Sequence, residues 1–125
     1  MSIIKYEVKV YSDGYTEWYL NGKLHREDGP ACEYTNGSKS WWVNGKRHRE
    51  DGPARELSDG SKLWYLNGKR HRIDGPAVEY ADGSKEWYLN GKELTESEFN
   101  NRTKIKELTI AEIQSLLGYK IKIIA

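Results

Sequence analysis

The stretch Trp64-Tyr65-Leu66-Asn67-Gly68-Lys69 decides the fold, because it recurs along the chain at a constant step of 23 residues. Close copies occupy residues 18–23, 41–46 and 87–92. A second block, His-Arg-x-Asp-Gly-Pro-Ala, keeps the same step at residues 25–31, 48–54 and 71–77. Self-similarity at a fixed period of this length is typical of repeat architectures, in which each unit is one small structural motif.

Asn-Gly or Asp-Gly pairs separate the aromatic and β-branched runs, and such pairs favour the type I′ turns of β-hairpins. They stand at residues 13–14, 21–22, 36–37, 44–45, 59–60, 67–68, 82–83 and 90–91. The Pro of each Asp-Gly-Pro cannot donate to a strand ladder, so a strand ends there. We therefore predict a mainly β fold, an elongated antiparallel β-hairpin array (a meander) of about four units over residues 1–94.

The last part of the chain, residues 95–125, has a different pattern and is predicted to be a small helical and strand cap. Thr95-Glu96-Ser97-Glu98 has the spacing of a capping box, which favours a helix start. A second helix is expected from Thr109 to the stop at Gly118, followed by a strand over residues 119–123. This segment is expected to cover the last hairpin. The alternative is that it, or an exposed edge strand, forms a homodimer.

The composition of the 125 residues supports a folded domain without a strong global charge. Hydrophobic residues make up 37% and the mean hydropathy is −0.88, but five Trp and nine Tyr argue against disorder. Twenty basic against 19 acidic residues leave a net charge of +1, which disfavours binding to nucleic acid or an anionic membrane through charge alone. One cysteine and the lack of a long apolar segment predict a cytoplasmic protein.

The two faces of the predicted sheet follow from the turns, since opposed residues share a face and neighbours alternate. Two-residue loops pair Cys32 with Trp41 and Trp42 with Arg47. The face of the periodic tryptophans, together with Cys32 and Arg55, is assigned to the core. The same register places Glu79 opposite Glu86, an unfavourable pair.

The opposite face is the predicted functional surface, because Trp, Tyr and Arg are enriched in interface hot spots. The candidate protein-binding residues are Trp42, Arg47, Arg49, Tyr65, Arg70 and Arg72. The competing structural interpretation is that these arginines are solvated strand residues that cover aromatic rings. Such a surface would also suit single-stranded nucleic acid or a nucleotide, although the nearby row Glu33, Glu56 and Glu79 makes nucleic acid the less favoured partner.

The recurring His-Arg-x-Asp block is the one feature that suggests catalysis. His25, His48 and His71 recur with Asp28, Asp51 and Asp74. Equivalent residues two strands apart lie roughly 10 Å from each other, too far to share a metal ion. We expect histidines that pack over Trp and aspartates that accept backbone N–H bonds in their turns. The sequence thus predicts no catalytic residue, no metal site, no cofactor and no enzyme activity.

Residues 8–94, through the Trp, the Asn-Gly-Lys turn and the following His, resemble MORN-type repeats, which share the 23-residue period. The chain departs from that pattern after the His, where it has Arg-x-Asp-Gly-Pro-Ala, and so resembles variant repeats of bacterial, phage and giant-virus proteins. The resemblance implies a binding or scaffolding role. It suggests a phage-encoded inhibitor of a host defence complex, of the anti-CRISPR type, acting in the host cytoplasm, and alternatively a scaffold that binds anionic lipid surfaces. A membrane partner is disfavoured because no long basic stripe is present.

Overall fold

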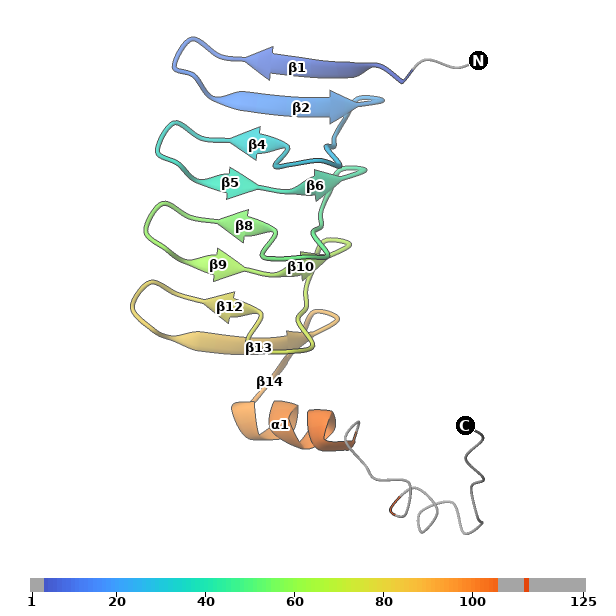
Figure 1. Cartoon of the computed structure of the whole chain (residues 1–125), viewed down its shortest axis with the longest axis vertical. Helices are drawn as coiled ribbons and strands as arrows, with labels where there is room; N and C mark the ends of the chain where they lie inside the picture. The colour runs from blue at the N-terminus through green and yellow to red at the C-terminus, as the bar shows by residue number, and fades with distance from the viewer. Residues whose placement is uncertain (1–3, 106–111, 113–125) are drawn as a thin grey trace, which may run out of the picture. The chain divides into compact units, whose positions relative to one another are not determined.

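The computed structural model describes residues 4–105 and residue 112, and the chain divides into two compact units, Met1–Leu94 and Thr95–Ala125. The first unit is a stack of β-hairpins in which each repeat contributes one step (Figure 1). Its strands are β1 (Tyr6–Val10), β2 (Thr16–Leu20), β3 (Lys23–Leu24), β4 (Cys32–Glu33), β5 (Lys39–Ser40), β6 (Trp42–Val43), β7 (Lys46–Arg47), β8 (Arg55–Glu56), β9 (Lys62–Leu63), β10 (Tyr65–Leu66), β11 (Lys69–Arg70), β12 (Val78–Glu79), β13 (Lys85–Leu89) and β14 (Lys92–Leu94).

The principal sheet is antiparallel and follows the order β1-β2-β4-β5-β8-β9-β12-β13-β14, with β3 paired to β2. The hairpins β6-β7 and β10-β11 form two small separate sheets. In these middle repeats the long strand is interrupted at Trp41 and Trp64, whereas β2 and β13 run through without a break. The predicted hairpin meander is confirmed.

One turn of each unit is the predicted two-residue loop. Asn21, Asn44, Asn67 and Asn90 have φ values of 50° to 52°, and each is followed by a glycine with positive φ. Both central residues of a type I′ turn need positive φ, which Asn and Gly tolerate best. The register Trp42↔Arg47 and Val43↔Lys46 confirms the pairing expected at this turn.

The other turn of each unit differs from the prediction. Tyr34 N donates to Ser38 O and Gly37 N donates to Tyr34 O, so the loop has three residues and Gly37 occupies the left-handed position at φ +92°. This is the hairpin with a type I turn and a glycine bulge. Cys32 consequently pairs with Ser40 instead of Trp41, and Glu79 pairs with Lys85 instead of Glu86. The predicted register of these hairpins is wrong by one residue.

This slip of one residue changes which side chains share a face, because strand side chains alternate with a period of two. Cys32, Arg55 and Val78 lie on the face of Trp42, and Glu33, Glu56 and Glu79 lie on the face of Trp41. We call the face that carries Trp18, Trp41, Trp64 and Trp87 the tryptophan face. The tyrosine face denotes the opposite one, with Tyr19, Trp42, Tyr65 and Tyr88.

The core is also placed differently from the prediction. The four periodic tryptophans are half-buried, whereas Val78 is fully buried and Cys32 is only 2% exposed. The central buried cluster joins Ala54, Leu63, Tyr65 and Val78. Within residues 4–94, the guanidiniums of Arg26, Arg49 and Arg72 lie over the indoles of Trp18, Trp41 and Trp64.

The second unit contains helix α1 (Glu96–Ile105), and its start confirms the predicted capping box. Glu98 N donates to Thr95 Oγ1 at 3.1 Å, and Thr95 N donates to Glu98 Oε1 at 2.9 Å. The predicted helix from Thr109 to Gly118 and the strand over 119–123 lie outside the residues that the structure describes. Across the described part of the chain, α1 included, no helix has the length and apolar character needed to cross a bilayer.

Candidate protein-binding surface

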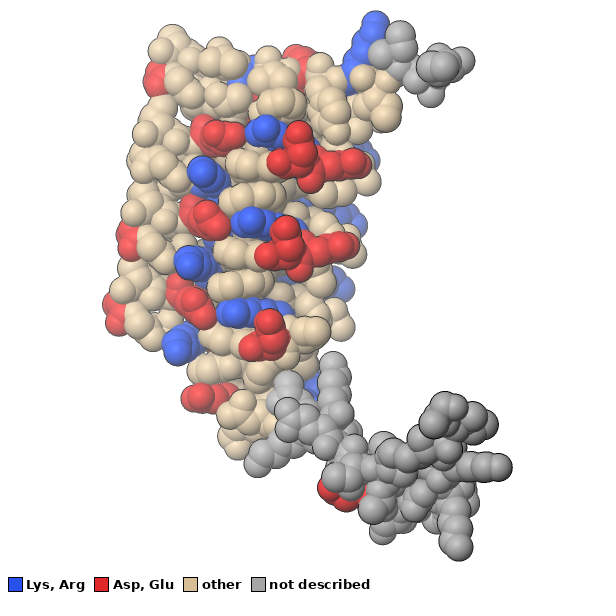
Figure 2. Space-filling model, in the orientation of Figure 1, with Lys and Arg blue, Asp and Glu red and all other residues tan. Residues whose placement is uncertain are grey.

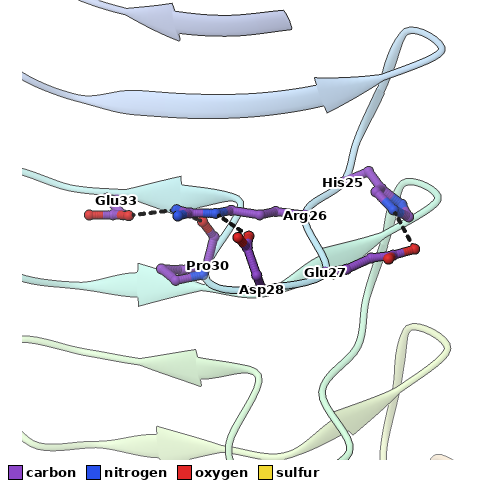
Figure 3. Close-up of polar contacts among 6 residues, drawn as sticks. All are labelled: His25, Arg26, Glu27, Asp28, Pro30 and Glu33. Carbon is purple, nitrogen blue, oxygen red and sulfur yellow. Dashed lines mark hydrogen bonds and ion pairs between the residues drawn. The ribbon is translucent and has the colours of Figure 1, made fainter. Parts of the chain in front are cut away.

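The arginine of the first His-Arg-x-Asp block organises the loop that joins one repeat to the next (Figure 3). Arg26 Nε donates to Asp28 at 3.0 Å, and its Nη1 donates to Pro30 O at 3.2 Å and to Glu33 at 3.0 Å. The guanidinium carbon lies 3.9 Å from the centre of the Trp18 indole. A planar guanidinium can stack and donate at the same time, which an ammonium cannot.

The same arrangement recurs at the next two repeats. Arg49 contacts Asp51, Pro53 O and Glu56 and lies 3.9 Å from the Trp41 ring centre. Arg72 makes the equivalent contacts to Asp74, Pro76 O and Glu79 and lies 3.8 Å from the Trp64 ring centre. Arg49 and Arg72 were predicted to bind a partner beside Arg47 and Arg70, but they lie on the tryptophan face, where the chain itself uses their donors.

The tryptophan face is also lined by alternating charges. Cross-strand pairs join Glu33 to Lys39, Glu56 to Lys62 and Glu79 to Lys85, and Lys39 and Lys62 also oppose the glutamate of the next repeat. Figure 2 shows rows of basic and acidic side chains that recur down the stack. Opposite charges directly across a ladder stabilise it modestly. The charges of this face are therefore largely balanced within the chain.

The recurring histidines connect successive repeats. His25 Nδ1 accepts the backbone N–H of Asn44 at 2.9 Å, and His48 and His71 accept those of Asn67 and Asn90 at 3.0 and 2.9 Å. Each imidazole thus holds the type I′ turn of the following unit. The packing of His over Trp stays a prediction. Asp28 accepts from Arg26 Nε instead of a backbone N–H of its turn.

Each His-Arg-x-Asp block thus has its histidine and its aspartate hydrogen-bonded within the chain. The Nδ1 atoms are occupied as acceptors, and the aspartates receive the arginine donors. Among the described residues, no three His, Cys, Asp or Glu side chains are grouped so that they could hold a metal ion.

The tyrosine face brings together four of the six predicted binding residues, namely Trp42, Arg47, Tyr65 and Arg70. The Arg47 guanidinium carbon lies 5.0 Å from the Trp42 ring centre and 5.6 Å from that of Tyr65. Arg70 lies 5.2 Å from the ring centre of Tyr88, in the following repeat. Aromatic rings and guanidiniums therefore alternate along the middle and last repeats, a geometry that favours cation–π attraction.

Arg70 has three polar partners within the chain. Its Nε donates to Tyr65 Oη at 3.4 Å, its Nη1 donates to Tyr88 Oη at 3.2 Å, and Glu86 Oε1 lies 3.5 Å from Nη1. The hydrogen bond to Tyr65, and after it the one to Tyr88, raises the pKa of Arg70 despite burial.

Arg47 differs from Arg70 in having no such partners. Its Nε is buried and has no hydrogen-bond partner among the described residues. Arg47 also forms no ion pair with any of these residues. The Tyr65 hydroxyl accepts a hydrogen bond from Arg70, but the equivalent residue beside Arg47 is Trp42, which has no hydroxyl. The Trp42 indole N–H donates instead to Ser40 Oγ at 2.8 Å. A guanidinium held between two rings without an anion can receive one from outside the chain.

Arg55 is a cationic residue of the tyrosine face that the sequence interpretation placed on the tryptophan face. It occupies the position of Cys32 and Val78 in the neighbouring repeats, and on the tyrosine face it opposes Ser40 and Leu63. Within the described residues it forms no ion pair either. The signal for it was present in the sequence, because an arginine replaces a small apolar residue at one repeat only.

A tyrosine cluster surrounds Glu17 in the first repeat, on the tyrosine face. Tyr11 and Tyr15 donate to the Glu17 carboxylate at 2.7 and 3.0 Å, and the Tyr15 and Tyr34 rings stack at 4.8 Å. Burial raises the pKa of Glu17, but hydrogen bonds from Tyr11, Tyr15 and Tyr19, together with the charge of Lys9, outweigh burial, and the net pKa lies below the ordinary value. The Glu17 carboxylate thus already accepts hydrogen bonds within the chain in the first repeat, and the Glu86 carboxylate does so in the last repeat.

The fold and this surface are the basis on which function is inferred, because similarity to known proteins adds nothing to them. No protein-family model, no curated protein and no solved structure matches the chain.

Proposed function

We propose that the protein is a non-catalytic repeat module that binds another protein through its tyrosine face. The observation that supports this most directly is Arg47, which lies between Trp42 and Tyr65 and has no anionic partner in the part of the chain that the structure describes. Residues of these three types dominate the binding energy of protein interfaces when they lie at the centre of the contact. The single-layer stack presents them on a broad surface.

The tryptophan face supports the proposal by contrast. Its arginines are occupied by Asp, Glu and backbone carbonyl groups of the chain, and its lysines oppose glutamates. Exposed charges that are already paired within the chain add little to the affinity for a partner. The tyrosine face around Arg47 and Arg55 lacks this internal balance.

The experiment is affinity capture from a host lysate with the full-length chain, comparing the wild type with Arg47→Glu. The matched control is Lys46→Glu, which makes the same charge change one residue earlier, at an exposed hairpin position. Loss of a captured protein with Arg47→Glu alone supports the proposal, and equal capture by both variants contradicts it. Since the repeats resemble those of phage and viral proteins, a host defence complex is the partner we propose to test first.

A further inference from the structure

Arg47 and Arg70 occupy equivalent positions in successive repeats, but different side chains surround them. The two arginines can therefore be compared directly. Arg70 lies beside Glu86 of the following repeat, at 3.5 Å. The position 23 residues before Glu86 is Leu63, and the position 23 residues before Arg70 is Arg47. Where Arg70 has a carboxylate, Arg47 therefore has an apolar side chain.

The position across the ladder also differs between the two repeats. Glu86 opposes Val78, whereas Leu63 opposes Arg55. The third repeat therefore has two guanidiniums near Leu63, one from Arg55 on the adjacent strand and one from Arg47 beside Tyr65. Arg26, Arg49, Arg70 and Arg72 each lie within 3.5 Å of a carboxylate, but in residues 4–94 neither Arg47 nor Arg55 has an ion pair.

We propose that Arg47 and Arg55 form a receptor site for a carboxylate of the bound protein, which would lie against the two guanidiniums next to Leu63, the buried residue that stands where Glu86 pairs with Arg70. This inference rests on the proposed protein-binding function and names the chemistry that the partner brings. Two like charges on one face without a counterion raise the free energy of the unbound protein. An incoming aspartate or glutamate removes that cost and forms charge-assisted hydrogen bonds.

The surroundings of the site favour an acidic protein side chain over a nucleic acid strand. Along the tyrosine face, the engaged carboxylates Glu17 and Glu86 lie in the repeats on either side of the two arginines. A chain of phosphates that followed the face would meet these carboxylates, whereas one side chain reaching between them would not. The half-buried ring of Trp42 supplies the apolar contact that protein interfaces combine with such a pair.

The test is a titration of the full-length, ¹⁵N-labelled chain with an oligoglutamate peptide, following the Nε–H signals of Arg47 and Arg55. We expect both signals to shift and to saturate. Leu63→Glu supplies the missing carboxylate from within the chain and should weaken peptide binding about tenfold or more. Leu63→Gln, which has the same shape without the charge, is the matched control and should keep binding close to that of the wild type.

Two further variants keep the test decisive if Leu63→Glu does not fold. Arg55→Val introduces the residue that the fourth repeat uses at this position, and it should weaken peptide binding without loss of the fold. Glu86→Leu frees Arg70 and should add a second site, seen as a shift of the Arg70 Nε–H signal. The absence of any shift at Arg47 in the wild type, or unchanged binding in Arg55→Val, overturns the inference.

The carboxylate site can be distinguished from a nucleic-acid site and from the proposed function itself. Tighter binding of oligothymidylate than of oligoglutamate at equal charge and salt would assign the site to nucleic acid and overturn the inference. If a partner captured from lysate depends on Arg47 but is retained by Leu63→Glu, the proposed function stands and the carboxylate site fails. If capture is insensitive to Arg47→Glu while the peptide titration succeeds, the proposed function fails and the anion site stands.

Discussion

The guanidinium carbon of Arg49 lies 3.9 Å from the centre of the Trp41 indole, and the same side chain donates to Asp51, Pro53 O and Glu56. A single layer of hairpins has no second layer to cover its aromatic residues. In this repeat, a guanidinium lies over each of three indoles. Carboxylates of the following loop and strand form ion pairs with each of these guanidiniums. The arrangement accounts for why Arg, Asp and the glutamate after Pro-Ala-x recur together.

Arg49→Lys is expected to destabilise the protein by about 1–3 kcal/mol, because Lys keeps the charge but cannot stack and donate to three acceptors at once. Urea unfolding followed by tryptophan fluorescence measures the loss. The matched control is Arg47→Lys, where no acceptor is present in the described part of the chain and the expected loss is below about 1 kcal/mol. Equal losses in the two variants would contradict the role given to Arg49.

Gly75→Ala is expected to cost about 1–2 kcal/mol through steric crowding. A Cβ at Gly75 would lie 3.0 Å from the Arg72 guanidinium carbon, and the hydrogen bonds of Arg72 keep that group from moving away. The backbone of Gly75 does not need positive φ, so the side-chain contact alone is tested. In an Arg72→Ala background the cost should vanish, and a cost that persists would show that the loop backbone is responsible.

His25→Ala is expected to lower the free energy of unfolding more than His48→Ala. Both lose an acceptor for a turn N–H, worth about 1 kcal/mol. The His25 side chain is only 4% exposed against 18% for His48, so its removal also leaves a cavity. Urea unfolding gives the ranking, and faster hydrogen exchange at the Asn44 and Asn67 amides, respectively, locates each loss. An equal cost for both would exclude the burial argument.

Asp59→Asn combined with Asp82→Asn is expected to leave stability near neutral pH almost unchanged and to reduce its loss in acid. The Ser61 backbone N–H, then the Ser61 hydroxyl, lowers the pKa of Asp59, and the Ser84 hydroxyl and backbone N–H lower the pKa of Asp82. A folded-state pKa below the unfolded value stabilises the fold above the unfolded pKa, and this contribution is lost as pH falls through the folded pKa.

The second repeat already shows that Asn serves this turn, since Asn36 Oδ1 accepts from Ser38 N at 2.9 Å. Urea midpoints measured from about pH 5 to about pH 2 should therefore fall less steeply in the double variant than in the wild type. An identical pH profile for the two proteins would contradict the contribution given to these carboxylates.

Much of the fold could be predicted from the repeat itself, and the errors have one source. Asn44-Gly45 and Asn36-Gly37 look alike in sequence, but the first forms a two-residue turn and the second a three-residue turn with a glycine bulge. The choice depends on whether the Asn backbone enters the left-handed region or its side chain accepts the N–H two residues later. That choice shifts the register by one residue and moves Cys32, Glu33 and Arg55 to the opposite faces.

The sequence alone determined the 23-residue unit, its hairpin character and the common face of Trp42, Arg47, Tyr65 and Arg70, because turn chemistry and strand alternation are local properties. The tertiary structure alone decided that Arg49 and Arg72 cover indoles while Arg47 and Arg55 have no counterion within the described residues. These distinctions depend on which side chain of the next repeat lies across the ladder. Contacts between successive repeats, such as Arg70 with Glu86 and His25 with Asn44, arise only when the repeats stack.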